Sequence, residues 1–274
     1  MYELTYRELP NLDAYLERIG YTGSREPTLE TLNALIYAHQ CTVPFETLDC
    51  CDYHLPVSLS VEHLYEKIVE KRRGGYCFEL NGIFLTLLRA LGYNAWSCMC
   101  RVAANFDTLR PIKHRGIMVR LDGRLYYCDV GLGGSMPPFA VALDGGRQTE
   151  MGETFWVEAL DAEGWYLVKR LSGKGLHDDG SVQGAERNVV IFSTLPMLAE
   201  DFEAYSYQCW AFPDSRFVTI RMANLRTPEG FIKLENNSLT VCENGSFTVQ
   251  EIPEADIPAL LKEQFGLEKC EYTC

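Results

Sequence analysis

Two adjacent glycines, separated by one tyrosine from a cysteine, constrain this chain more than any other feature. Gly74 and Gly75 predict a tight turn, and Cys77 follows it closely. Behind the cysteine, apolar residues recur at helical spacing up to Gly92, which stands where the end of a helix favours glycine. Cys77 is therefore expected in the first turn of a helix. Unpaired backbone N–H groups there stabilise an anion, so the position favours a thiolate nucleophile.

A predicted hairpin brings a histidine and an aspartate together. Strand-like runs flank Asp122-Gly123, and this dipeptide is a strong signal for a two-residue hairpin loop. In that register His114 lies opposite Gly131. Asp129 then points to the same face as His114, and the two are diagonal neighbours roughly 7–8 Å apart at the backbone. The hairpin thus places a carboxylate where it can hold a histidine ring.

Cys77, His114 and Asp129 are therefore the candidate catalytic residues. A cysteine–histidine–acid triad requires a histidine that takes the thiol proton and an acid that orients the histidine. Each residue also has an ordinary explanation: a buried structural thiol, a strand histidine at a hairpin base, and a turn carboxylate. The spacing alone does not show that Cys77 reaches the other two.

These motifs resemble those of the arylamine N-acetyltransferase family. The run 73–81, Arg-Gly-Gly-Tyr-Cys-Phe-Glu-Leu-Asn, is similar to the family's cysteine motif. His114 and the run 129–134 resemble its histidine strand and its Asp-Val-Gly-Phe-Gly loop. Residues 43–49 resemble its Pro-Phe-Glu-Asn segment, and residues 188–217 match more loosely. The resemblance covers most of the chain.

The resemblance implies an α+β fold with a cysteine-protease-like triad. Residues 1–92 would form an N-terminal helical bundle that carries the nucleophile, and residues 93–190 a central β-barrel that carries the histidine and the aspartate. Residues 191–274 would form a C-terminal α/β lid. The residue patterns agree, because helical periodicity gives way to strand-like runs near residue 94. They also predict a strand at 216–223 and a final helix near 257–265.

The implied activity is acetyl-CoA-dependent N-acetylation of arylamines or hydrazines. Acetyl-CoA would be a co-substrate, with no permanently bound cofactor, and Cys77 would carry the acetyl group in a ping-pong route. Two other enzymes stay open: an amide synthase or lactam-forming acyltransferase of the same family, and a papain- or transglutaminase-like cysteine hydrolase. A non-catalytic binding domain is a further alternative, against which the intact triad argues.

Four residues near the cysteine are expected to support it. Glu46 and Arg73 would form a buried ion pair that fixes the turn, because a buried charge is costly unless it is paired. Glu79 and Asn81 lie in the first turn of the predicted helix. An acid there suits the helix dipole, and an amide can bond nearby backbone.

The same resemblance suggests where the substrates bind. Phe45, Gly131, Leu132 and Gly133 would lie at the donor and acceptor site. Leu132 stands where the family usually has phenylalanine, so we expect a roomier acceptor pocket that cannot stack a ring at this position. Thr47 replaces the family's usual asparagine, and we expect this change to be structural.

Charge is distributed unevenly along the chain. The net charge of −13 argues against nucleic acid and against an anionic membrane as partners. Residues 71–124 nevertheless hold ten basic and three acidic residues. We expect this basic block to attract the phosphates of coenzyme A, through Arg101, Arg110, Lys113 and Arg115. Chance exposure of these side chains would explain the block equally well.

No pattern in the sequence predicts a metal site, a membrane span or a secretory signal. The eleven cysteines include no Cys-x-x-Cys pair, so a metal site is not expected. No run of about 18 apolar residues predicts a membrane span, and no secretory signal is visible. We therefore expect a cytoplasmic enzyme with reduced thiols.

Overall fold

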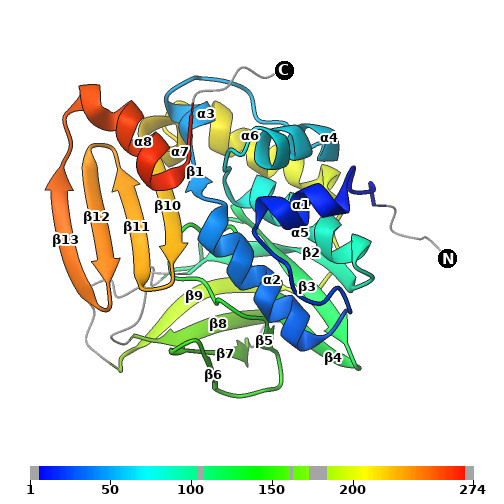
Figure 1. Cartoon of the computed structure of the whole chain (residues 1–274). Helices are drawn as coiled ribbons and strands as arrows, with labels where there is room; N and C mark the ends of the chain where they lie inside the picture. Colours follow the sequence, from blue (N-terminus) through cyan, green and yellow to red (C-terminus); the bar gives the residue numbers. More distant parts are fainter. Residues whose placement is uncertain (1–5, 104–107, 161–162, 173–183, 269–274) are drawn as a thin grey trace.

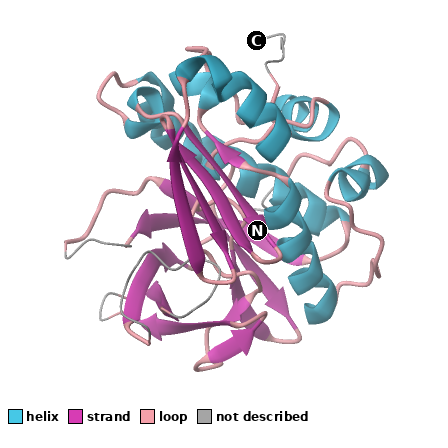
Figure 2. Ribbon diagram, turned by 60° about the vertical axis from the view of Figure 1, so that its left-hand side comes forward, coloured by secondary structure: helices cyan, strands magenta, loops and turns pink. Residues whose placement is uncertain are grey.

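The computed structural model describes residues 6–103, 108–160, 163–172 and 184–268. Helices gather over one side of an eight-stranded sheet, and a five-stranded sheet stands beside them (Figure 1). Figure 2 shows the same division from another side, with helices along one side of the molecule and strands on the other. The expected α+β class is confirmed.

The N-terminal part of the chain is helical, as the residue pattern predicts. Its elements are α1 (Leu12–Arg18), α2 (Leu29–Thr42), α3 (Leu48–Cys51), α4 (Val61–Leu64), the π-helical turn η1 (Tyr65–Glu70) and α5 (Cys77–Ala90). Side-chain oxygens of Asn11 and Thr28 cap α1 and α2 by accepting backbone N–H groups. Every residue of α5 from Cys77 to Leu88 is buried, so α5 is the central helix of this part. Gly92 follows it with a φ of +88°, which glycine adopts without strain.

The eight-stranded sheet is antiparallel throughout, in the order β5-β4-β3-β2-β9-β8-β7-β6. Its strands are β2 (Asn94–Val102), β3 (His114–Leu121), β4 (Arg124–Cys128), β5 (Val141–Ala142), β6 (Gln148–Glu150), β7 (Glu153–Ala159), β8 (Trp165–Leu171) and β9 (Glu186–Ser193). It encloses its own apolar core, which includes Met118, Phe155 and Phe192. The predicted hairpin register is confirmed, because Leu121 pairs with Arg124 and Ile117 with Cys128.

The five-stranded sheet combines one short strand from the N-terminal half of the chain with four strands from its C-terminal part. Its order is β1 (Phe45–Glu46), β10 (Met222–Thr227), β11 (Gly230–Glu235), β12 (Ser238–Glu243) and β13 (Ser246–Glu251). The helix α8 (Ile257–Phe265) packs on it, at the predicted residues. Phe45 pairs with Asn224, so the segment before the cysteine motif is the edge strand of the C-terminal sheet.

The elements between the two sheets include one that differs from the prediction. They are the short turn η2 (Glu200–Phe202), α6 (Glu203–Ala211) and α7 (Arg216–Thr219), and η3 (Glu254–Asp256) precedes α8. The strand expected at 216–223 is wrong in its first half, which is α7. Ser215 caps that helix by accepting the N–H of Phe217. The expected boundary near residue 190 falls inside β9, and the three-part domain division stays a prediction.

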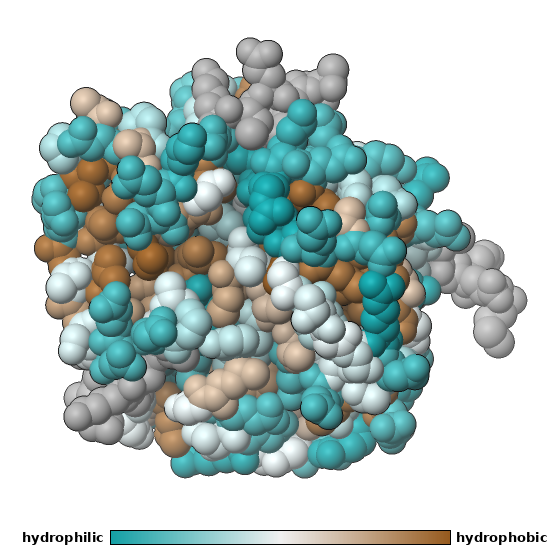
Figure 3. Space-filling view, viewed as in Figure 1, coloured by the Kyte–Doolittle hydropathy of each residue, from teal (hydrophilic) through white to brown (hydrophobic). Residues whose placement is uncertain are grey.

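Apolar side chains on the surface gather on the five-stranded sheet, at the left of Figure 3. Phe247 and Val249 of β13 are 40% and 68% exposed. Across the described residues, no helix has both the length and the apolar character that a membrane crossing requires.

Candidate active site

The turn before Cys77 is shaped by a close approach between two backbone segments. A Cβ atom on Gly74 would lie 2.1 Å from the carbonyl oxygen of Pro44, so only glycine fits there. The N–H of Glu46 donates to the carbonyl of Gly75 at 2.9 Å, which ties the turn to β1. The two glycines of the motif therefore make room for the segment 44–46, and neither has a positive φ.

Cys77 is the first residue of α5, as the sequence predicts. The helix start is fixed by Glu79, whose Oε2 accepts the backbone N–H of Tyr76 at 3.0 Å. The Cys77 side chain is almost fully buried, and its Sγ donates to the carbonyl oxygen of Lys113 at 3.7 Å.

The pKa of the Cys77 thiol is not lowered, as a helix start alone would favour. Burial raises the pKa of the Cys77 thiol well above its ordinary value, and the nearby Cys209 and Asp129 add to this rise. Backbone hydrogen bonds from Arg115 and Phe78 oppose it only in part. The helix start alone therefore does not produce a thiolate, and the thiol needs a base within reach.

His114 and Asp129 form a buried pair at the end of the hairpin. His114 Nε2 lies 2.6 Å from Asp129 Oδ2, and both side chains are at most 1% exposed. Asp129 also accepts hydrogen bonds from the hydroxyl of Tyr127 at 2.8 Å and from the N–H of Gly131 at 2.9 Å. Burial acts to raise the pKa of Asp129, but His114 and hydrogen bonds from His114, Asn81 and Gly131 together hold it below its ordinary value.

Asn81 joins this pair to the helix that carries Cys77. Its Nδ2 donates to Asp129 Oδ1 at 2.9 Å and to the carbonyl of Arg115 at 2.7 Å, and its Oδ1 accepts the N–H of Val130 at 3.0 Å. A Cβ atom on Gly131 would lie 3.0 Å from the Cα atom of Cys77. The structure therefore brings the cysteine helix, the histidine strand and the aspartate loop to one place.

A network of five charged side chains lies behind the turn. The Arg73 guanidinium contacts Glu46 Oε1 at 2.7 Å, as predicted, and also Asp49 Oδ1 at 3.0 Å. Lys67 Nζ contacts Asp49 Oδ2 and Glu79 Oε1, both at 2.7 Å. This set of residues, Glu46, Asp49, Lys67, Arg73 and Glu79, is called the turn network below.

Lys67 and Asp49 were not among the predicted site residues. Lys67 lies beside Ile68 and three residues after Leu64, on the apolar side of its helical segment. A lone cation in such a position requires a buried partner, so Lys67 in this apolar pattern predicts a buried acid nearby. The network holds three acids and two bases, and burial raises the pKa of Glu79 to about 7 although Lys67 acts to lower it.

Aromatic rings line the side of the turn next to β1. The rings of Phe45 and Phe217 lie 6.5 Å apart, and those of Phe217 and Tyr76 lie 5.2 Å apart. Gly133 has a φ of +72°, and a Cβ atom there would lie 2.7 Å from the Phe45 ring. Phe217 was not among the predicted site residues. Leu132 is half-buried and packs against the barrel core.

The basic block does not form one exposed surface. Lys113 is exposed, and Arg101 is half-buried, with its guanidinium 5.1 Å from the centre of the Trp165 ring and 2.6 Å from the carbonyl of Arg110. Arg115 is only 3% exposed and donates from Nε to Ser97 Oγ at 2.8 Å. The expectation that Arg115 contacts coenzyme A at an exposed basic surface is therefore wrong. Among the residues that the structure describes, no cluster of acids, histidines and cysteines could hold a metal ion.

Comparison with known families identifies the class of protein. A family model described as N-acetyltransferase matches residues 28–270, which places the chain among the N-acetyltransferases. The arylamine N-acetyltransferase of Escherichia coli (strain K12) is 32% identical over 266 residues, covering 94% of this chain and 89% of the relative. The "Arylamine N-acetyltransferase / N-hydroxyarylamine O-acetyltransferase" of Salmonella typhimurium is 30% identical over 93% of this chain and 88% of the relative. The chain belongs to the arylamine N-acetyltransferase family and is an acyltransferase of that kind.

Solved structures agree with this result. The arylamine N-acetyltransferase of Mycobacterium tuberculosis superposes with a TM-score of 0.84 at 31% identity and covers 93% of both chains. The enzyme of Mycobacterium marinum in complex with CoA superposes with a TM-score of 0.82 at 29% identity, over 93% of this chain and 92% of that one.

Proposed function

We propose that this enzyme transfers the acetyl group of acetyl-CoA to arylamines or hydrazines by a ping-pong route through acetyl-Cys77. The observation that carries the proposal is the 2.6 Å contact between His114 and Asp129, held by Asn81 against the helix that begins at Cys77. The M. marinum relative in complex with CoA supports the choice of donor.

In the first half-reaction Cys77 attacks the acetyl thioester. His114 takes the thiol proton, which is needed because burial holds the pKa of that thiol high. The new C–S bond forms while the thioester C–S bond breaks, and the leaving CoA thiolate takes the proton from His114. Backbone N–H groups at the start of α5 stabilise the oxyanion of the intermediate. Asp129 stays ionised, as its lowered pKa implies, and stabilises the imidazolium.

In the second half-reaction the amine attacks the acetyl-cysteine. An arylamine is largely neutral at pH 7, so its lone pair is available without prior deprotonation. His114 accepts a proton from the attacking nitrogen and returns it to the departing Cys77 thiolate. The products are the acetylated amine and the free enzyme.

The binding residues are assigned by position. Phe45 and Phe217 provide ring faces for an aromatic acceptor, and Gly133 lies against the Phe45 ring. Gly131 and Leu132 are assigned to the same site because they precede Gly133 in the chain. Arg101 and Lys113 are the basic residues proposed for the CoA phosphates. We also propose a cytoplasmic location, on the sequence grounds given above.

The test is intact mass spectrometry after mixing with acetyl-CoA. We expect one acetyl adduct that is absent in Cys77→Ala. The matched control is Cys209→Ala, because Cys209 is a buried thiol that contributes to the raised pKa of Cys77, and this variant should keep the adduct. The adduct should be discharged much faster by an arylamine or a hydrazine than by water. An adduct that persists in Cys77→Ala would make another cysteine the nucleophile. Equally fast discharge by water would favour a hydrolase.

A further inference from the structure

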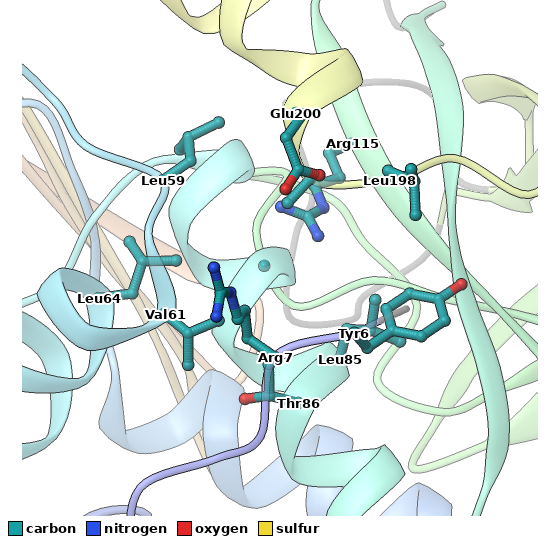
Figure 4. A pocket seen from close by; sticks show the side chains of 12 residues that line it. Tyr6, Arg7, Leu59, Val61, Leu64, Leu85, Thr86, Arg115, Leu198 and Glu200 are labelled. Atoms are coloured by element: carbon teal, nitrogen blue, oxygen red, sulfur yellow. The ribbon is translucent and has the colours of Figure 1, made fainter. Parts of the chain in front are cut away.

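We propose that a cavity behind α5, the helix that begins at Cys77, binds an amphipathic monocarboxylate. The cavity has a volume of about 460 Å³, within the usual range for sites of small molecules. It lies between the N-terminal segment at Tyr6 and Arg7, α4 and α5, and the start of η2 (Figure 4). None of the residues of the proposed acetyl-transfer site lines it.

Most of the cavity wall is apolar. The apolar side chains are Leu59, Val61, Leu64, Leu85, Leu198 and Ala199. The wall also holds two guanidinium groups and one carboxylate, from Arg7, Arg115 and Glu200, and is completed by Tyr6, Gly82 and Thr86. Figure 4 shows the side chain of Arg7 extending from the N-terminal segment toward Arg115 and Glu200.

Arg115 is the residue that points to an anionic ligand. It is 3% exposed, and buried charges in proteins are normally paired with an opposite charge. Its Nε and Nη1 atoms donate to Ser97 Oγ and to the carbonyl of Phe78, and its guanidinium lies 5.0 Å from the centre of the Phe202 ring. Within the described part of the chain, no carboxylate lies within ion-pair distance of Arg115 or of Arg7.

The net charge of the cavity selects a single anion. Two guanidinium groups against one carboxylate leave an excess of one positive charge. Burial lowers the pKa of Arg115 to about 10, while Tyr6 and Glu200 are among the groups that act to raise it, so Arg115 is charged at neutral pH. A planar carboxylate matches the geometry of a guanidinium, and the leucine side chains accommodate an alkyl or aryl body. A free phosphate would leave this apolar wall unused.

The cavity and the proposed acetyl-transfer site share a wall but no lining residue. A Cβ atom on Gly82 would lie 2.8 Å from Arg115 Nη1, so the glycine in α5 makes room for the guanidinium. The main chain of Arg115 faces the other way, where its carbonyl accepts from Asn81. We therefore expect the carboxylate to bind to enzyme whose Cys77 is already modified.

The test is isothermal titration calorimetry with sodium octanoate. We expect binding to the wild type, at least tenfold weaker binding of the neutral analogue 1-octanol, and a similar loss for octanoate in Ala199→Trp, which fills the cavity at its half-buried rim. Arg7→Gln should also weaken octanoate several-fold. Glu200→Gln should strengthen it, because a repelling charge is removed.

Matched controls separate the cavity from general effects. Ala204→Trp places the same ring on the exposed face of α6, outside the cavity, and Arg25→Gln removes an exposed arginine elsewhere. Both should bind octanoate as the wild type does, and so should enzyme carboxamidomethylated at Cys77. Unchanged affinity in Ala199→Trp, or loss of binding after carboxamidomethylation, would overturn the proposal. No detectable binding to the wild type at millimolar octanoate would do so as well.

Discussion

The two sides of the Cys77 turn both bury charge, but they satisfy it in different ways. On one side the turn network joins five charged side chains, and each has at least one oppositely charged partner at 2.7–3.0 Å. On the other side, among the described residues, Asp129 contacts one side chain that can carry a positive charge, His114, and takes its remaining hydrogen bonds from groups that are neutral, including Asn81 and Tyr127.

This difference suggests that the two sides of the turn have different roles. A histidine can lose and regain its proton near neutral pH, whereas lysine and arginine stay charged. In the proposed mechanism the pair of His114 and Asp129 therefore changes charge during the reaction, whereas Lys67 and Arg73 of the turn network keep their charge and hold the helix start. We expect changes to the pair of His114 and Asp129 to affect the rate, and changes to the turn network to affect stability.

The largest expected effect is on the rate, in Asp129→Asn. The substitution keeps the size of the side chain but removes the charge that stabilises the imidazolium. We expect kcat/KM to fall by about 10⁴-fold, as for the loss of the acid in comparable triads. The protein should stay folded, and alkylation of Cys77 by iodoacetamide at neutral pH should slow. Equal alkylation rates in both proteins would remove Asp129 from the mechanism.

The largest expected effect on stability is in Lys67→Met. It leaves Asp49 and Glu79 buried without one of their cations, and breaking a buried pair in this way costs about 3–5 kcal/mol of unfolding free energy. Lys262→Met, at a side chain that is 64% exposed, is the matched control and should cost little. Urea titration measures both. A neutral effect of Lys67→Met would mean that the turn network does not hold the helix start.

Several elements of the fold can be predicted from patterns among residues that are close in the sequence. The start of α5 at Cys77 follows from the glycine turn and the helical spacing behind it, and the register of β3 and β4 follows from Asp122-Gly123. The helix α8 also lies where its periodicity predicts. In each case the interacting groups are close in sequence, so the pattern of residues carries the information.

The turn network and the aromatic wall could not be predicted in the same way. Phe45 pairs with Asn224 and packs near Phe217, and such distant partners leave no spacing signal. The segment 216–223 shows why short apolar runs mislead, because periodicity alone does not separate a short strand from a single helical turn. There the Ser215 cap determined the helix.

A smaller effect is expected in how the stability of the turn network depends on pH. Burial raises the folded-state pKa of Glu79 to about 7, above the ordinary value of 4.5. Between these two pH values the folded protein binds a proton that the unfolded chain releases, so this contribution to stability falls as pH rises from 4.5 to about 7. Its slope is about 1.4 kcal/mol per pH unit at most.

The variant Glu79→Gln should remove that contribution and keep the cap, since glutamine also accepts the N–H of Tyr76. We compare urea midpoints of both proteins from pH 4.5 to 7. His39 acts in the opposite direction, because burial lowers its pKa to about 3, so only the difference between the two proteins isolates Glu79. Parallel pH profiles for the two proteins would contradict the assignment.

The smallest expected effect is in Tyr127→Phe, on the triad side. The substitution removes the 2.8 Å hydrogen bond from the Tyr127 hydroxyl to Asp129 Oδ2, while His114, Asn81 and Gly131 continue to donate. One hydrogen bond to a charged group contributes roughly 1.5–3 kcal/mol, and the remaining donors can compensate for part of that loss. We therefore expect kcat to fall by roughly tenfold or less, far short of the loss in Asp129→Asn.

The pH profile distinguishes this role from a purely structural one. With one donor fewer, the pKa of Asp129 rises toward its ordinary value, so the acid limb of the Cys77 alkylation rate should move to higher pH. Tyr126→Phe, at the neighbouring buried tyrosine of β4, is the matched control and should leave that limb in place. A shift of the same size in both variants would mean that loss of a buried tyrosine hydroxyl from β4, rather than its bond to Asp129, explains the change. The pair of His114 and Asp129 would then share with the turn network a contribution to stability rather than to the reaction.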